Sequence, residues 1–208
     1  RNGRVESLLD GRQAPRDLPF LELDGYTCLP GLIDMHTHLA DRAEDNANLV
    51  VFHTRSREAQ LAISEAHAAA TLAAGFTTVR NVGAYIAWTD RDLRDAINQG
   101  QVPGPRMQVV GYYLTIPGGG GDLLVPGVSA ADTPARVRTG VARNAGEFAA
   151  RAQLAIDGGA DLLKVIASGA VIAYGGVPGA PEMTQDEIAA VVAVAHAAGR
   201  KVAAHAHG

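Results

Sequence analysis

Short apolar segments alternate along most of the chain with longer segments of helix-forming residues. The apolar segments predict strands within 29–38 and at 76–79, 106–110, 161–167 and 201–205. The intervening segments predict helices at about 57–74, 90–99, 144–157 and 184–198, and a glycine follows each one. Strands that alternate with helices form parallel βαβ units with right-handed crossovers. The pattern therefore predicts an α/β fold around a parallel sheet.

Residues with ligand chemistry lie at the ends of these predicted strands. His36, His38, Lys164, His205 and His207 all lie late in a strand or just beyond it. Five strands are compatible with an open doubly wound sheet or with the first part of a (β/α)8 barrel. In such barrels the chemistry occurs at this end of the strands. We therefore expect the first four to five βα units of a (β/α)8 TIM barrel.

The first 28 residues follow a different pattern. Two short extended candidates, at 4–8 and 18–23, are separated by Gly11 and Pro15. They are typical of strands in a small accessory sheet. We expect residues 1–28 to be part of a small β-sandwich side domain. Residues 29–208 would then be the N-terminal half of the barrel, whose completion lies outside this chain.

The composition excludes several classes of protein. Hydrophobic residues make up 47% of the chain and charged residues 19%, as in ordinary globular proteins. The formal net charge of −4 gives no support for a nucleic-acid partner, and no apolar run has the length of a membrane span. Cys28 is the single cysteine, so no internal disulfide forms. The sequence begins at Arg1 rather than Met, so a removed leader and the cellular compartment stay open.

Two histidines lie one residue apart at the end of the first apolar segment. Side chains at i and i+2 of a strand share a face, so His36 and His38 can hold one metal ion through ring nitrogens. Two solvated histidines at a strand end would give the same pattern. His205 and His207 repeat the spacing after the last apolar segment, which favours the metal. We expect His205 to be a metal ligand and His207 to contact substrate or to support the ligands.

Lys164 interrupts the apolar segment 162–166. A buried ammonium group is costly unless a partner offsets its desolvation. Such a lysine pairs with a carboxylate, extends to the rim of the barrel, or reacts with carbon dioxide to form a carbamate. The carbamate is anionic and has two oxygens, so it can bridge two cations. The residues alone leave these three outcomes open.

A long loop at 111–126 contains four consecutive glycines. It lacks the Gly-Lys-Ser/Thr of a phosphate-binding loop. Loops of this length in compact domains are usually functional or mobile, and we expect this one on the substrate side. Tyr112 and Tyr113 in this loop, and Tyr174 in the glycine-rich segment 168–183, lie near the expected mouth. They are candidates for substrate contact.

Three motifs together resemble one enzyme family. The segments 29–38, 159–165 and 202–208 are similar to motifs of the amidohydrolase superfamily, and most closely of its imidazolonepropionase-like branch of metal-dependent dipeptidases and ochratoxin-hydrolysing amidases. The resemblance implies a distorted TIM barrel with a side β-sandwich and two divalent metal ions, usually zinc. It also implies the site residues: a first-strand pair of His36 and His38, Lys164 carboxylated by carbon dioxide and bridging the metals, and His205 from the fifth strand.

The resemblance also implies an activity. We expect a hydrolase that cleaves a peptide or N-acyl amino acid amide with a metal-bridging hydroxide and releases a C-terminal amino acid, ochratoxin-like amides included. A cyclic-amide hydrolase or deaminase of the same fold is one alternative. The other is an inactive metal-binding fragment that needs a complementary chain.

Two features depart from the family pattern. The sixth-strand histidine and eighth-strand aspartate of the family are not in this chain, so we expect the remaining half of the barrel as a partner. In the glycine-rich loop, Gly120 stands where relatives often carry a histidine. If that histidine binds a substrate carbonyl in the relatives, substrate binding differs in this chain. The exact substrate, the metal and any homo-oligomer are left open.

Overall fold

A computed structural model describes residues 5–10, 13, 17, 19–171 and 177–207. The chain divides into two compact units, 1–30 and 31–208. The described residues of the first unit contain no strand. The β-sandwich side domain expected at 1–28 therefore remains a prediction.

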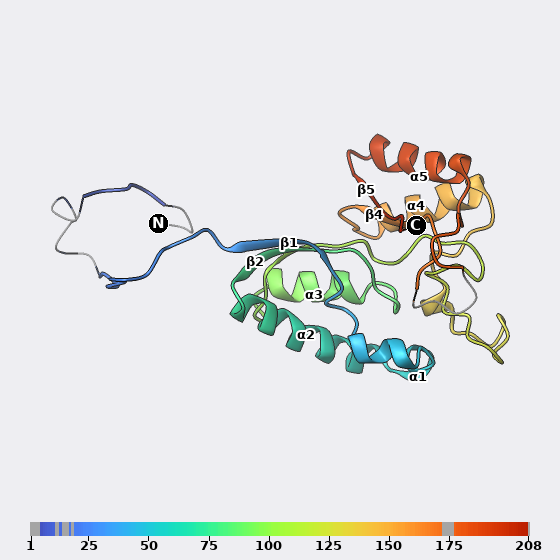
Figure 1. Ribbon diagram of the computed structural model, residues 1–208, viewed down its shortest axis with the longest axis horizontal. Coiled ribbons are helices and arrows are strands. Elements are labelled where there is room, and N and C mark those ends of the chain that lie inside the picture. The colour runs from blue at the N-terminus through green and yellow to red at the C-terminus, as the bar shows by residue number, and fades with distance from the viewer. Residues whose placement is uncertain (1–4, 11–12, 14–16, 18, 172–176, 208) are drawn as a thin grey trace. The chain divides into compact units, whose positions relative to one another are not determined.

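The second unit alternates strands and helices in the predicted order (Figure 1). Its strands are β1 (Leu32–Thr37), β2 (Phe76–Asn81), β3 (Arg106–Gln108), β4 (Leu163–Ile166) and β5 (Val202–His205). Its α-helices are α1 (Val51–Thr54), α2 (Arg57–Ala73), α3 (Thr89–Asn98), α4 (Ala145–Asp157) and α5 (Gln185–Ala197), with short 3-10 helices η2 (Ala43–Ala47) and η3 (Ala135–Val137). The four long helices and the α/β class confirm the sequence predictions. Within the described ranges, no helix has the length and hydrophobicity that crossing a membrane requires.

Each pair of neighbouring strands in this unit is parallel and is made of strands that follow each other in the sequence. β1 pairs with β2 and β2 with β3, while β4 pairs with β5. The segment around Leu114 joins the two sheets, because its amide donates to the carbonyl of Lys164 at 2.8 Å and its carbonyl accepts from the amide of Ile166 at 2.9 Å. Sequential parallel strands covered by helices are the arrangement of a TIM-type barrel wall.

β3 is shorter than the apolar segment 106–110 predicts. Side-chain carboxylates accept hydrogen bonds from the backbone amides just beyond Gln108. Asp161 accepts from the amide of Val109 at 3.0 Å, and Asp90 accepts from the amide of Val110 at 3.0 Å. Those amides are therefore not available to a neighbouring strand, and the regular ladder ends there.

Three apolar clusters form the core of this unit. One lies between α4, α5 and β4 and includes Phe148, Val165 and Val191. A second gathers side chains of α2, α3, β2 and β3 around Val79. The third is rich in aromatic residues, among them Phe52, Tyr85 and Tyr113. This third cluster includes side chains that also line the site described below.

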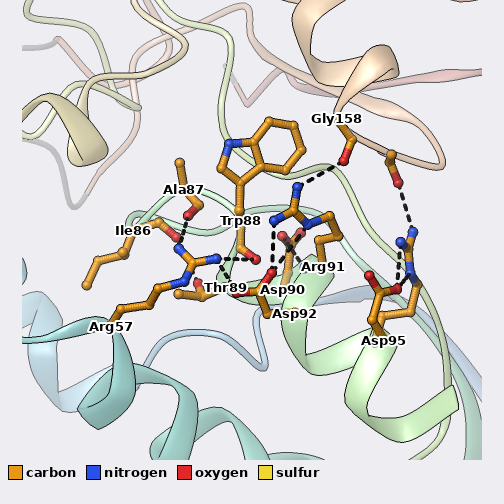
Figure 2. A network of polar contacts seen from close by, with 12 residues as sticks. Arg57, Ile86, Ala87, Trp88, Thr89, Asp90, Arg91, Asp92, Asp95 and Gly158 are labelled. Carbon is orange, nitrogen blue, oxygen red and sulfur yellow. Dashed lines mark hydrogen bonds and ion pairs between the residues drawn. The ribbon is translucent and has the colours of Figure 1, made fainter. Parts of the chain in front are cut away.

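The entry to α3 is held by a network of polar contacts. Figure 2 shows Arg57 of α2 at this entry, where its guanidinium donates to the carbonyl of Ala87 at 3.0 Å and pairs with the carboxylate of Asp92. Trp88, the residue before α3, has a φ of 73°, a left-handed conformation that residues other than glycine seldom adopt. The ion pair and the backbone contact on either side of Trp88 hold this turn in place.

Asp90 connects the same entry to the segment that follows β3. Its side chain is buried and accepts from the amides of Val110 and Gly111 at 3.0 and 3.1 Å. Burial raises the pKa of Asp90, and the backbone donors oppose that shift. The carboxylate thereby fixes the backbone immediately before Tyr112 and Tyr113.

Candidate active site

One cavity collects the residues that the sequence singles out at its strand ends. Its volume is about 400 Å³, and its lining includes His36, His38, Lys164, His205 and His207. Tyr113 and Gly120 line it as well. Tyr174 lies outside the described residues, so its contact with substrate remains a prediction.

The strands bring these side chains together in pairs. His36 lies within β1 and His38 directly follows that strand, with ring centroids 5.4 Å apart. His205 ends β5, and its ring lies 5.7 Å from that of His207. Lys164 lies in β4 opposite Ala203 of β5. Strands of both sheets, β1 of one and β4 and β5 of the other, therefore contribute side chains to the same cavity.

Lys164 is almost completely buried, with 3% of its surface exposed. Among the residues that the structure describes, no carboxylate forms a salt bridge with it, so the pairing considered from the sequence is not seen there. Burial lowers the pKa of Lys164, and the charge of Arg80 lowers it further. Both effects favour the neutral amine, the form of an amine that reacts as a nucleophile.

Burial favours the neutral form of three histidines of the cavity, His36, His38 and His205. Burial is the largest cause that lowers the pKa of His36 and of His205, followed in each by the charge of Lys164. The pKa of His38 falls to about 4 because of burial, with further contributions from His36 and Lys164. Neutral imidazole is the form that binds metal ions.

The second nitrogens of two of these rings differ in their partners. Nδ1 of His38 lies 3.1 Å from the hydroxyl of Tyr113, within hydrogen-bonding distance. Nε2 of His205 is buried and has no hydrogen-bond partner in the described part of the chain. A buried ring nitrogen without a partner is rare in folded proteins and fits a ligand position.

The donor types fit a divalent metal, and the arrangement needs a further ligand. Four imidazoles and an amine line one cavity. Within the described ranges, however, no group of three or more His, Cys, Asp or Glu side chains is placed to hold a metal ion. An oxygen ligand made from Lys164, or a ligand from further protein, would have to complete the set.

The glycine-rich loop forms another part of the cavity wall. The amide of Gly120 donates to the two carboxylate oxygens of Glu182 at 3.1 and 2.9 Å. A Cβ atom at Gly120 would lie 2.9 Å from the Cβ atom of Ala170, so the wall has little room for a side chain there. Glu182 was not singled out from the sequence, because no motif surrounds it. Tyr85, which also lines the cavity, was missed because it lies in the mostly apolar segment 82–87.

A second cavity, of about 340 Å³, shares the side chains of His38, Tyr85 and Tyr113 with the first. Asp41 also lines it, and neither oxygen of this buried carboxylate has a hydrogen-bond partner of normal geometry among the described residues. Burial raises the pKa of Asp41 to about 8, which the nearby amide of Tyr85 offsets only in part. Asp41 was missed in the sequence analysis because it lies in the polar stretch 41–56.

Known proteins resemble this chain in sequence. The sequence profile of the amidohydrolase family matches residues 27–208. The ochratoxinase of Aspergillus niger is 29% identical over 199 residues, which cover 86% of this chain and 39% of the relative. The chain therefore spans about two fifths of the length of that curated relative.

Solved structures agree in fold. A Xaa-Pro dipeptidase with methionine bound in its active site is 35% identical with a TM-score of 0.75, over 86% of this chain and 43% of the other. A prolidase complexed with N-methylphosphonate-L-proline is 33% identical with a TM-score of 0.80, over 93% of this chain and 47% of the other. The ochratoxinase structure has a TM-score of 0.71 at 25% identity, over 86% of this chain and 43% of the other.

Proposed function

Because the chain belongs to the amidohydrolase family, we propose that it carries the first part of a binuclear metal site that hydrolyses an amide bond. The observation that carries this proposal is the single cavity shared by His36, His38, Lys164 and His205. These residues come from β1, its C-terminal end, β4 and β5, which are far apart in the sequence.

Each side chain has a role in this proposal. His36 and His38 would hold one metal ion, proposed to be zinc, and His205 would hold a second. Lys164, carboxylated at Nζ by carbon dioxide, would supply oxygen ligands to both, and its lowered pKa supports that reaction. Metal ions bound there would polarise an amide carbonyl and make water a stronger nucleophile. His207 faces the same cavity and is proposed to contact substrate.

The substrate class comes from the relatives. They are named ochratoxinase, Xaa-Pro dipeptidase and prolidase. We infer a substrate in which an acyl group or an amino acid is joined through an amide to a C-terminal amino acid, with that amino acid as one product. The remaining strands of the barrel are a proposed partner, in the same protein or in a second chain.

β1 and β5, the first and last strands, each have one edge without a paired strand among the described residues, which supports the proposal of further strands. Within the described residues, β1 pairs only with β2, and β5 only with β4. β1 also exposes Leu32, Ile33 and Met35, by 50%, 62% and 45% of their surfaces. Unpaired parallel edges and exposed apolar side chains favour an arrangement in which further strands cover them.

The lysines of the chain give a sharp test. The sequence has two, Lys164 and the exposed Lys201. We expect the intact protein, prepared with zinc and ¹³C-bicarbonate, to give a carbamate ¹³C resonance that Lys164→Ala removes and Lys201→Ala retains. Zinc content and hydrolysis of an N-acyl amino acid should fall in the first variant only. A resonance that persists in Lys164→Ala, or hydrolysis that does not depend on Lys164, would contradict the proposal.

A further inference from the structure

We propose that Tyr113 is a positioning residue of the metal site, whose hydroxyl holds the ring of His38 so that Nε2 is the nitrogen that binds metal. This inference rests on the proposed function, since it requires His38 to be a ligand. It changes the role expected for Tyr113, from contact with substrate to support of a ligand.

The contact itself is the first support. The hydroxyl of Tyr113 lies 3.1 Å from Nδ1 of His38, and the two residues are 75 positions apart in the sequence. A hydrogen bond at one ring nitrogen of a histidine fixes which nitrogen carries the proton and how the ring is turned. The ring of His38 also has a backbone hydrogen bond with Gly83. With Nδ1 engaged by the hydroxyl, Nε2 is the nitrogen that we assign to the metal ion.

The place of the Tyr113 ring is fixed by its surroundings. A Cβ atom at Gly83 would overlap the ring, so the missing side chain at Gly83 makes room for it. The ring also packs against Tyr85 with centroids 5.2 Å apart, and Tyr85 packs against Phe52 at 5.0 Å. Tyr113 is 9% exposed. A hydroxyl on a ring held in this way has little freedom to leave His38.

A tyrosine hydroxyl can both donate and accept a hydrogen bond, so it can serve His38 in either tautomer. When a metal ion occupies Nε2, the proton lies on Nδ1, which then donates to the tyrosine oxygen.

The neighbouring tyrosine offers a matched control. The hydroxyl of Tyr112 donates to the backbone carbonyl of Arg151 in α4 at 2.8 Å. Tyr112 belongs to the cluster between α4, α5 and β4, whereas Tyr113 belongs to the aromatic cluster beside the site. Each residue loses one hydrogen bond when changed to phenylalanine, but only Tyr113→Phe affects His38.

The test measures zinc affinity of the intact protein by competition with a chelator. We expect Tyr113→Phe to weaken binding of the His38 metal by about 10- to 100-fold, the usual effect of removing the partner of a ligand histidine. Tyr112→Phe should retain the affinity of the unchanged protein. In a His38→Ala background, Tyr113→Phe should have no further effect on zinc affinity, because the ligand it supports is already gone.

The outcomes separate this inference from the proposed function. Failure of the unchanged protein to bind zinc would overturn both. If it binds zinc through His38 but Tyr113→Phe leaves the affinity intact, the inference alone is wrong. A variant with normal zinc affinity and an increased KM would instead assign Tyr113 to substrate contact and overturn the positioning role.

Discussion

The guanidinium of Arg138 forms a two-point ion pair with the carboxylate of Asp122, with nitrogen–oxygen distances of 2.7 and 2.8 Å. The Asp122 side chain has no exposed surface, and 16% of the Arg138 side chain is exposed. Asp122 also accepts from the amide of Gly118 at 2.9 Å. The pair therefore fastens the glycine-rich loop, which carries Gly120 to the wall of the cavity.

Removal of this carboxylate is expected to be costly. Asp122→Ala leaves the Arg138 guanidinium without its partner in a largely buried place, and we expect a loss of about 3–5 kcal/mol in the free energy of unfolding. Urea unfolding of the intact protein measures it. Asp132→Ala is the control, because Asp132 is exposed and its side chain bonds only to Ser129 among the described contacts. Equal losses in the two variants would contradict the prediction.

The tip of the same loop should not tolerate a side chain. In Gly120→Ala the new Cβ atom would lie 2.9 Å from Cβ of Ala170 and 3.1 Å from Cγ2 of Ile166. Overpacking of this kind costs about 1–3 kcal/mol, and we expect the free energy of unfolding to fall by that amount and the melting temperature to fall with it.

A second substitution tests whether that contact is the cause. Ala170→Gly removes the atom that Gly120→Ala would meet first, so the double variant should regain part of the lost stability. The backbone nitrogen of Ala170, 3.3 Å from the same position, prevents full recovery. A double variant no more stable than Gly120→Ala would show that another contact limits the loop.

The ends of the strands were predictable from the sequence, because polar side chains interrupt or close the apolar segments. Lys164 and His205 stand out in that way, and regular alternation alone places them at one edge of a parallel wall. The length of β3 was not predictable, since it depends on Asp90 and Asp161, which approach its backbone from outside the segment. Burial of Lys164 followed from its local pattern, whereas only the fold could show that no carboxylate of the described ranges forms a salt bridge with it.

Contacts between distant loops had no local signal. Tyr113 was noted as a loop tyrosine near the mouth, but its hydrogen bond to His38 joins two segments that no short motif relates. Asp41 is a comparable case. It lies in a polar stretch whose composition is that of an exposed loop, yet its carboxylate oxygens are buried. Sequence pattern describes the face of an element, and these contacts depend on which elements meet.

Asp41 should make stability depend on pH. Its pKa is about 8 in the folded protein and near the ordinary value of 3.8 when the chain unfolds. Between these values the folded state retains a proton that the unfolded state has released, so stability falls as pH rises from about 4 to about 8. Asp41→Asn cannot ionise and should lose less stability across this range.

Melting temperatures at about pH 5 and about pH 8 measure the effect. We expect Asp41→Asn to gain a few kcal/mol over the unchanged protein on going to the higher pH, since a pKa shift is worth about 1.4 kcal/mol per unit. Glu44→Gln, an exposed carboxylate in the same loop, should leave the pH dependence as it is. Parallel curves for Asp41→Asn and the unchanged protein would show that this carboxyl does not titrate with a raised pKa.

His205 should stabilise the protein only when a metal is bound. Its buried Nε2 has no hydrogen-bond partner in the described ranges, so without metal it carries the cost of a desolvated polar group. We expect His205→Leu, which removes that nitrogen, to raise the melting temperature of metal-free protein by a few degrees, as about 1–2 kcal/mol does in a chain of this size.

Zinc should raise the melting temperature of the unchanged protein, because a ligand that binds only the folded state stabilises it. The same addition should have a much smaller effect on His205→Leu. His196→Leu is the control, since His196 lies exposed near the end of α5 and should keep the full response to zinc. A zinc response in His205→Leu equal to that of the control would remove His205 from the ligand set.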